Sequence, residues 1–278
     1  MTLLTFDTEG DTKRNNTTIE LNKLNEWLKS NKLTINPSKT KTMTYNKKRG
    51  ILEPIVLDLV ELEEVASFKL VGTFLDPNLN YKSHVKHVIK KLGLFTHLFA
   101  RTKKNLPLKL KLLFFNALLK PHIEYCLEIW GNSSHAKVIQ KKLNNILRII
   151  LNKRKISHIS NEYKNLKILK FQDMVKLSIL KQCIKRFTCK PHMSNIFPLK
   201  DRTRDTRSSF PLELERRYPP NPKYLKQYCY ILPNLWNGEF QIYRHLNLKK
   251  AVREFKENAI YSYENTPCTQ RNCFICNR

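Results

Sequence analysis

The first side chains that could do chemistry are the carboxylates of the segment FDTEGD, namely Asp7, Glu9 and Asp11. Carboxylates this close in sequence can share a divalent cation, and a bound cation can activate a nucleophile. However, no strand–turn–strand pattern of apolar residues frames the segment. An acidic loop is therefore the favoured interpretation, and we assign no catalytic residue here.

A second set of candidate ligands lies near the C-terminus, where PCTQRNCFICNR contains Cys268, Cys273 and Cys276. Thiolates at C-x4-C-x2-C spacing suit zinc, but a structural zinc site normally takes four ligands. The nearest histidine, His245, lies well upstream and would have to fold back to complete the site. Free or redox-active thiols are favoured, and zinc is the alternative.

The strongest chemical signal is the charge. The 278 residues contain 51 Lys and Arg against 23 Asp and Glu, a formal net charge of +28. A hydrophobic fraction of 41% and an aromatic fraction of 10% exclude a disordered basic tail. A folded chain this basic repels itself unless a polyanion neutralises it, and nucleic acid is the commonest such partner. A solvated basic surface without a partner is the alternative.

The sequence shows neither a membrane-spanning segment nor a secretory signal. Lysines interrupt every apolar run before it reaches the ~20 residues of a membrane span, and MTLLTFDTEGDTKR lacks the basic and apolar regions of a secretory signal. The seven cysteines are irregularly spaced, so we expect reduced thiols. These features predict an intracellular protein, nuclear or cytoplasmic, with no membrane partner.

The N-terminal third must supply a small α+β scaffold. Apolar residues at helical spacing predict a helix over 17–31 with Ile19, Leu21, Leu24, Trp27 and Leu28 inward. Asn36-Pro37-Ser38 predicts a turn between two short extended segments, and β-branched residues over 51–76 predict two or three strands. We expect residues 1–78 to form a unit with short antiparallel strands.

The middle of the chain has the pattern of a helical bundle over 79–195. The first expected helix carries Tyr81, Val85, Val88, Leu92, Phe95 and Phe99 on one stripe. A second runs from Pro107 to Gly131 with a kink at Pro121, a third covers 136–153 with Val138 among its inward residues, and a fourth covers 171–187. Aromatic residues of this section are expected in the core rather than under bases, among them Phe114, Tyr125 and Trp130.

Residues 196–278 are expected to form an irregular extension. The segment 201–224 is rich in Arg, Asp, Ser and Pro, which is typical of an exposed linker. An aromatic segment, YCYILPNLWNGEF, and one further helix over LNLKKAVREFKENAI follow it. The overall prediction is an α+β chain that is mainly helical after its N-terminal third.

Basic residues fall in two clusters within the expected bundle, where they could contact phosphates without reading bases. The first cluster and the basic end that follows it are Lys82, Lys86, Lys90, Lys91, Arg101, Lys103 and Lys104. The second is Lys137, Lys141, Lys142, Arg148, Lys153, Arg154 and Lys155. Solvated helix faces are the alternative.

Three segments resemble the C-terminal part of reverse transcriptases from non-LTR retrotransposons of the jockey-like group. LNEWLKSNKLTINPSKTKTMTY resembles the end of the polymerase palm, through Lys32, Leu33, Ile35, Asn36, Lys39, Thr40, Met43 and Tyr45. VASFKLVGTFLDPNLNYKSHV is similar to a strand pair that holds the primer end, through Phe68, Lys69, Gly72, Leu75, Asp76, Tyr81 and His84, with Val71 where Leu is usual. LPLKLKLLFFNALLKPHIEYCLEIWGN resembles the thumb helix, through Ala117, Leu118, Pro121, Ile123, Tyr125, Trp130 and Gly131.

The resemblance implies RNA-directed DNA synthesis in the parent family, with two magnesium ions held by an early Asp and an F/Y-A-D-D turn. Alignment on the helix that contains Trp27 places Met1–Leu4 just after that turn, so we expect a truncated, inactive enzyme without a cofactor of its own. Lys39 occupies the place of a lysine that can protonate pyrophosphate. With neither metal nor nucleotide, Lys39 and Lys41 are expected to contact phosphate or solvent.

The leading hypothesis is a truncated reverse transcriptase that binds RNA or an RNA–DNA hybrid without synthesis. Its expected contacts are Lys39, Lys41, Lys69, Lys82, Lys86, Lys90, Lys91, Arg101, Lys103, Lys104, Lys141, Lys142 and Arg148. Other retroelement products are further candidate partners. The alternatives are a domesticated basic protein that coats or bridges nucleic acid, and a pseudogene fragment that never folds.

Overall fold

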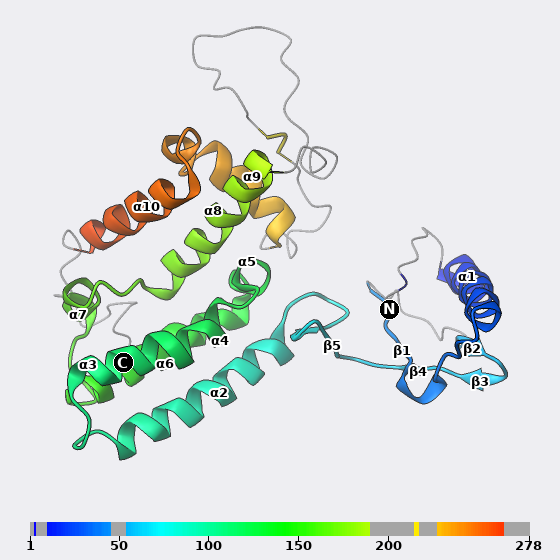
Figure 1. Ribbon diagram of the computed structural model, residues 1–278, viewed down its shortest axis with the longest axis horizontal. Coiled ribbons are helices and arrows are strands. Elements are labelled where there is room, and N and C mark those ends of the chain that lie inside the picture. The colour runs from blue at the N-terminus through cyan, green and yellow to red at the C-terminus, as the bar shows by residue number, and fades with distance from the viewer. Residues whose placement is uncertain (1–2, 4–9, 46–53, 190–213, 217–226, 264–278) are drawn as a thin grey trace, which may run out of the picture. The chain divides into compact units, whose positions relative to one another are not determined.

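The structure is a computed structural model that describes residues 3, 10–45, 54–189, 214–216 and 227–263. Its contacts divide the chain into two units, Met1–Ser83 and His84–Arg278, which are treated separately below. The described residues are mainly helical, with a few short strands confined to the N-terminal unit (Figure 1). This confirms the predicted fold class. The three-part division at residues 78 and 195 stays a prediction.

The N-terminal unit combines one helix with three small ladders. Its elements are α1 (Gly10–Ser30), a 3-10 turn (Pro37–Lys39), β1 (Lys41–Thr42), β2 (Val56–Leu57), β3 (Val60–Glu61), β4 (Glu63–Glu64), β5 (Phe68–Leu70) and β6 (Thr73–Leu75). The pairs β2–β3 and β5–β6 are antiparallel, as predicted, whereas β1 pairs with β4 in parallel. Residues 33–35, expected to be extended, lie in a coil before the 3-10 turn.

A small core fixes how α1 is rotated. Leu21 packs in a cluster with Ile55, Leu57 and Leu62, with Ile35 against it. On the same face of α1, Asn25 Nδ2 donates to Asp58 Oδ2 at 3.0 Å and Lys29 Nζ lies 3.0 Å from Asp58 Oδ1. Residues four apart share a helix face, so this contact with the β2–β3 turn determines which side of α1 is covered.

Two residues expected inward on α1 are instead exposed, Ile19 at 51% and Trp27 at 60%. At 100° per residue both lie on the opposite side of α1 from Leu21. The apolar spacing correctly predicts a helix here. The prediction that all five apolar residues point inward is wrong for Ile19 and Trp27.

The hairpin β5–β6 and the loop after it explain the roles of Val71, Gly72 and Asp76. Val71 (φ 43°) and Gly72 (φ 82°) both have positive φ, as a two-residue type I′ hairpin turn requires. The buried Asp76 carboxylate then accepts the backbone N–H groups of Asn78, Asn80 and Tyr81 at 3.2, 3.0 and 2.7 Å. This carboxylate organises the loop that leads into the next helix.

The C-terminal unit is built from packed helices. They are α2 (Lys82–Arg101), α3 (Leu108–Phe114), a π-helical turn (Phe115–Leu119), α4 (Lys120–Glu124), α5 (Leu127–Trp130), α6 (Lys137–Ile150), α7 (Ser160–Asn165), α8 (Phe171–Cys189), α9 (Tyr228–Asn237) and α10 (Leu248–Ser262). Short 3-10 turns at Ser134–Ala136 and Gln241–Tyr243 complete it. The aromatic segment before α10 thus forms a helix, and α7 was not predicted.

The expected kink at Pro121 takes a different form. The chain stays helical from α3 through a π-helical turn into α4, and Pro121 lies in the first turn of α4, directly after the π-helical turn. The helix instead ends at Tyr125, which is extended, and Cys126, which is left-handed at φ 49°. Tyr125 is consequently 46% exposed rather than buried, while Trp130 is fully buried as expected.

Trp130 joins three helices of this unit. Its ring lies 5.1 Å from that of His84 on α2 and 5.9 Å from that of Phe171 on α8. Its Nε1 donates to the Tyr125 carbonyl at 2.9 Å, which satisfies the buried indole N–H. The next residue, Gly131, has no room for a side chain, because a Cβ would lie 2.5 Å from the Leu127 carbonyl oxygen and 2.6 Å from Val175 Cγ2.

We expect Gly131→Ala to lower the free energy of unfolding by ~1–3 kcal/mol, since overpacking forces neighbouring atoms apart. Thermal and urea unfolding of the purified chain measure this. The matched control is Gly93→Ala on α2, where a Cβ meets nothing within 4 Å. That substitution should raise stability by ~0.5–1 kcal/mol, because Ala loses less backbone entropy in a helix. Equal effects of the two substitutions would contradict the assigned packing of Gly131.

Candidate nucleic-acid interface

Helix α2 presents one covered and one solvent-exposed side. His84, Val85, Val88, Leu92 and Phe99 are buried. On the other side Lys82, Lys86, Lys90 and Arg101 are exposed, and at 100° per residue they fall within a sector of about 100° around the helix. We call these four residues the α2 stripe. Its first three members follow one another at about 6 Å intervals along the helix axis.

Lys91 belongs to the predicted cluster but not to this stripe. It is half-buried, and its charge helps to lower the pKa of His122 on α4, mainly a consequence of burial of that imidazole. Lys103 and Lys104 follow α2 in a turn, where the Lys103 carbonyl accepts the buried Lys111 ammonium at 2.6 Å. The structure therefore gathers four of the seven predicted residues on one helix face.

The second predicted cluster is divided by the fold. Lys137, Lys141, Arg154 and Lys155 are exposed, Lys142 is half-buried, and Lys153 pairs with Glu162. Arg148 shares the helix face of Lys137 and Lys141 by periodicity, yet it is only 8% exposed and its Nε donates to the Ser157 carbonyl at 2.8 Å. We therefore assign Arg148 to packing and leave it out of the proposed interface.

The reason for this burial is the chain that follows α6. Residues after Ile150 turn back, and Tyr163 of α7 donates to Asn144 Oδ1 at 2.7 Å. Gln140 joins the same network through Tyr163 Oη and accepts the Phe171 N–H at 2.7 Å. The second half of α6 is thus covered on the side that carries the polar residues Asn144 and Arg148. Val138, which was expected to point inward, is instead 43% exposed.

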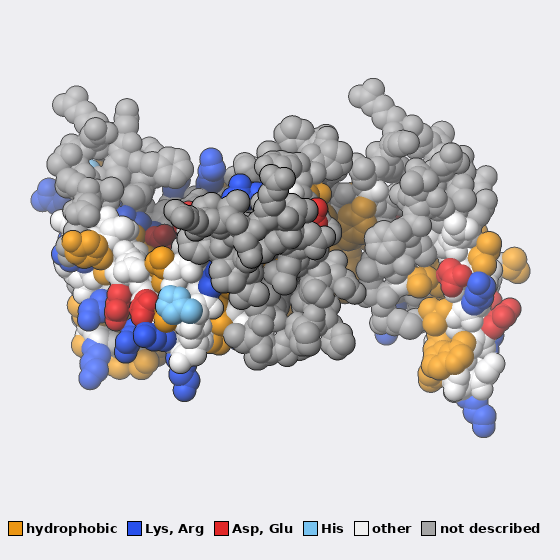
Figure 2. Space-filling model, turned by 90° about the horizontal axis from the view of Figure 1, so that it is seen from above, with side chains coloured by type: hydrophobic (Ala, Val, Ile, Leu, Met, Phe, Trp, Pro, Cys, Tyr) orange, Lys and Arg blue, Asp and Glu red, His pale blue; other side chains and the backbone are white. Residues whose placement is uncertain are grey.

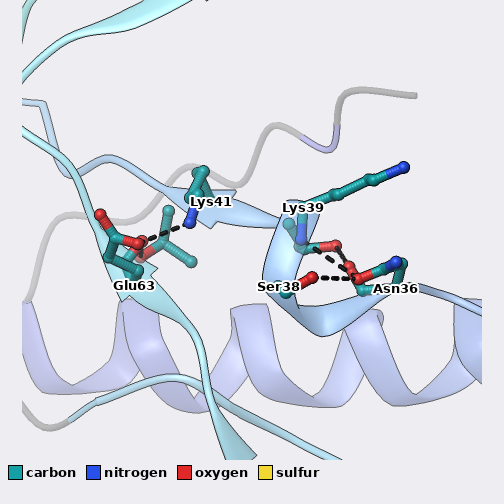
Figure 3. Close-up of polar contacts among 7 residues, drawn as sticks. Asn36, Ser38, Lys39, Lys41 and Glu63 are labelled. Atoms are coloured by element: carbon teal, nitrogen blue, oxygen red, sulfur yellow. Dashed lines mark hydrogen bonds and ion pairs between the residues drawn. The ribbon is translucent and has the colours of Figure 1, made fainter.

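The N-terminal unit holds the three remaining predicted contacts. Lys41 Nζ lies 2.5 Å from Glu63 Oε2, so its charge is partly neutralised by β4 (Figure 3). Lys39 is the last residue of the turn capped by Asn36, and its side chain points away from that turn (Figure 3). Within the turn, Asn36 Oδ1 accepts a hydrogen bond from Ser38 Oγ at 2.7 Å. Lys69 is exposed, with its ammonium 5.8 Å from the Phe74 ring.

Basic side chains do not form one continuous positively charged surface. On the face shown in Figure 2 they are interspersed with acidic and hydrophobic side chains. The exposed basic residues of α2, by contrast, share one side of a single helix, which the net charge alone does not reveal. An interface of this kind binds phosphates and leaves base edges unread.

The described parts of the chain contain no grouped metal ligands. No group of three or more His, Cys, Asp or Glu residues there is placed to hold a metal ion. Asp7, Glu9, Cys268, Cys273 and Cys276 lie outside the described residues, and of Asp11 only the backbone is described, in α1. The zinc alternative stays a prediction. None of the described helices is long and apolar enough to span a bilayer.

His84 has a structural rather than a binding environment. It is 3% exposed against Trp130, and burial, assisted by the charge of His87, lowers the pKa of His84 to about 4. The folded state therefore keeps this imidazole neutral at a pH where the unfolded chain, with a pKa near 6.5, takes up a proton.

Stability should accordingly be complete above about pH 6.5 and decline as pH falls toward 4, by ~2 kcal/mol at pH 5. Urea unfolding between pH 5 and 7.5 measures this decline. His84→Phe keeps a ring against Trp130 and should flatten the profile. His97→Gln, at an exposed position on the same helix, should leave it unchanged. A profile that His84→Phe does not alter would contradict this account.

Comparison with known proteins gives one informative match. The chain is 27% identical over 133 residues to the probable RNA-directed DNA polymerase from transposon X-element of Drosophila melanogaster. The match covers 46% of this chain and 15% of that protein. No protein-family model matches the chain, and no solved structure matches it. The chain thus has a distant, partial similarity to a retrotransposon reverse transcriptase, and it spans only a small part of that relative's length.

Proposed function

We propose that this chain binds RNA or an RNA–DNA hybrid through charge and shape, as a relative of non-LTR reverse transcriptases that does not itself synthesise DNA. The observation that carries the proposal is the α2 stripe, in which exposed basic residues lie opposite a buried apolar face. The similarity to a transposon polymerase supports nucleic acid as the polyanion. Lys39, Lys69, Lys104 and Lys141 are exposed additional candidates for phosphate contacts.

Removal of the stripe should weaken binding in a salt-dependent way. For Lys82→Gln/Lys86→Gln/Lys90→Gln, we expect the slope of log K against log salt to become shallower by about three, one for each lost phosphate contact. Fluorescence anisotropy with a labelled RNA–DNA hybrid at several salt concentrations measures the slope. The control is Lys164→Gln/Lys167→Gln/Lys249→Gln, which removes the same charge from exposed positions elsewhere. Equal slopes for the two variants would overturn the assignment of α2.

The absence of synthesis rests on chemistry. Two-metal phosphoryl transfer needs clustered carboxylates to hold the ions, and the 278 residues contain no F/Y-A-D-D run. The purified chain, mixed with a primed template, nucleotides and magnesium or manganese, should therefore leave the primer unextended. Gel analysis of a labelled primer measures this, with an intact reverse transcriptase as the positive control. Templated extension would refute this part of the proposal.

A domesticated binding protein remains the second candidate, since the α2 stripe alone does not require a polymerase ancestry. The two candidates differ in the nucleic-acid structure they should prefer. Tighter binding to a recessed primer end than to plain duplex of equal length favours the relative of reverse transcriptases. Equal affinity for both favours the general binder.

A further inference from the structure

Two ring contacts determine how α2 lies beside α4 and α5. Near the start of α2, the His84 ring centroid is 5.1 Å from that of Trp130 on α5. Further along α2, the Phe95 ring centroid is 5.6 Å from that of His122 on α4. Steps forward along α2 therefore match steps backward along α5 and α4, which lie beside it in Figure 1. The chain between His122 and Trp130 thus lies at the level of two lysines of the α2 stripe.

Tyr125 is an exposed aromatic residue at this level, directly after α4. Its backbone N–H donates to the Pro121 carbonyl at 3.1 Å, so the residue is still in helical register. It follows His122 by three residues, and residues three apart are neighbours on a helix face. Because the His122 ring contacts Phe95, Tyr125 lies on the side of α4 that is next to α2. Its side chain is nevertheless 46% exposed.

The backbone that carries this ring is fixed on both sides. The N–H of Tyr125 is bonded to Pro121, and its carbonyl accepts the indole N–H of the fully buried Trp130 at 2.9 Å. The chain then leaves the helix through the left-handed Cys126. A ring on such a backbone loses little conformational freedom when a flat ligand stacks on it. Tyr125 is therefore pre-organised for stacking.

The carboxylates nearest to Tyr125 in the sequence do not oppose an approaching polyanion strongly. Glu124 Oε1 lies 3.7 Å from Lys120 Nζ, which offsets its charge. Glu128 is directed to α8, where its Oε2 accepts from Ser178 Oγ at 2.7 Å. The α2 stripe, in contrast, presents ammonium groups to solvent at the level of the Tyr125 ring. Cations for phosphates and a ring for a base thus come from neighbouring helices.

We propose that Tyr125 stacks on an unpaired base of a strand whose phosphates are bound by the α2 stripe. Every base has a π-face, so a stacking ring binds bases with little regard to sequence. Within a continuous duplex both faces of each base are covered by its neighbours, and only unpaired or terminal bases offer a free face. The ligand class is consequently a duplex with a single-stranded overhang. This inference rests on the proposed function and names the nucleic-acid structure that its site prefers.

The test uses fluorescence anisotropy with two labelled RNA–DNA hybrids of equal duplex length, one blunt and one with an unpaired overhang. Wild type should bind the overhang hybrid more tightly. Tyr125→Ala should weaken binding of the overhang hybrid at least about fivefold, the loss expected for one stacked base, and leave the blunt hybrid unaffected. Its salt slope should stay at the wild-type value, because no phosphate contact is lost. Tyr125→Phe should behave as wild type.

Two controls separate stacking from folding. Tyr125→Leu keeps apolar volume without a π-face, so it should lose the overhang preference while it melts as wild type does. Tyr261→Ala removes an aromatic ring that is 65% exposed on α10, and it should keep the preference. The fluorescence of 2-aminopurine in the overhang reports stacking directly. It should be quenched by wild type and Tyr125→Phe, and not by Tyr125→Leu.

Three results would overturn the proposal. The first is equal overhang affinity and equal quenching for Tyr125→Leu and Tyr125→Phe. The second is a change in oligomeric state of Tyr125→Ala, seen by light scattering, with unchanged overhang affinity, since the ring would then bind a second copy of the chain. The third is failure of wild type to bind either hybrid, which removes the proposed function as well. If the α2 triple variant weakens both hybrids and Tyr125→Ala weakens neither, the proposed function stands and only the stacking site is lost.

Discussion

The burial of Trp130 is the contact on which the C-terminal unit depends. The indole is completely covered, between His84 of α2 and Phe171 of α8, and its only polar atom donates to the Tyr125 carbonyl. That donation is possible because the chain leaves the helix at Tyr125 and Cys126 and begins a new one. Gly131 then allows α5 to approach α8 to within the reach of Val175. One side chain thereby joins α2, α5 and α8.

The residues that resemble reverse transcriptases are mostly part of the scaffold. Asn36 caps a turn, Gly72 supplies a positive φ, and Asp76 binds three backbone N–H groups. Trp130 and Gly131 occupy the packed centre of the helical unit. A resemblance through such residues indicates a similar fold. The proposed binding of nucleic acid depends instead on surface lysines, few of which belong to these motifs.

The charge of this protein has several distinct uses in the structure. Lysines of the α2 stripe face solvent, where an ammonium can meet phosphate with little loss of hydration. Lys111 and Arg148 are buried and donate to backbone carbonyls, and Lys170 lies against the Tyr263 ring. Lys256 is of a third kind, since it is partly buried, and burial together with the charges of Lys120 and Lys181 lowers the pKa of its ammonium. The net charge of +28 therefore overstates the number of cations available to a partner.

The sequence by itself determined the helices with long apolar stripes, the turn at Asn36-Pro37-Ser38 and the mainly helical character after the N-terminal third. These follow from local periodicity and turn chemistry, which act between residues close in the chain. Only the tertiary structure decided that Arg148 is covered and that Trp27 and Val138 are exposed. Periodicity gives the faces of a helix, but burial depends on which other element packs against each face. α7 packs back on α6 after a turn of the chain, and α10 packs on α8 from a distant part of the chain, and neither arrangement can be read from the local pattern of the helix that is covered.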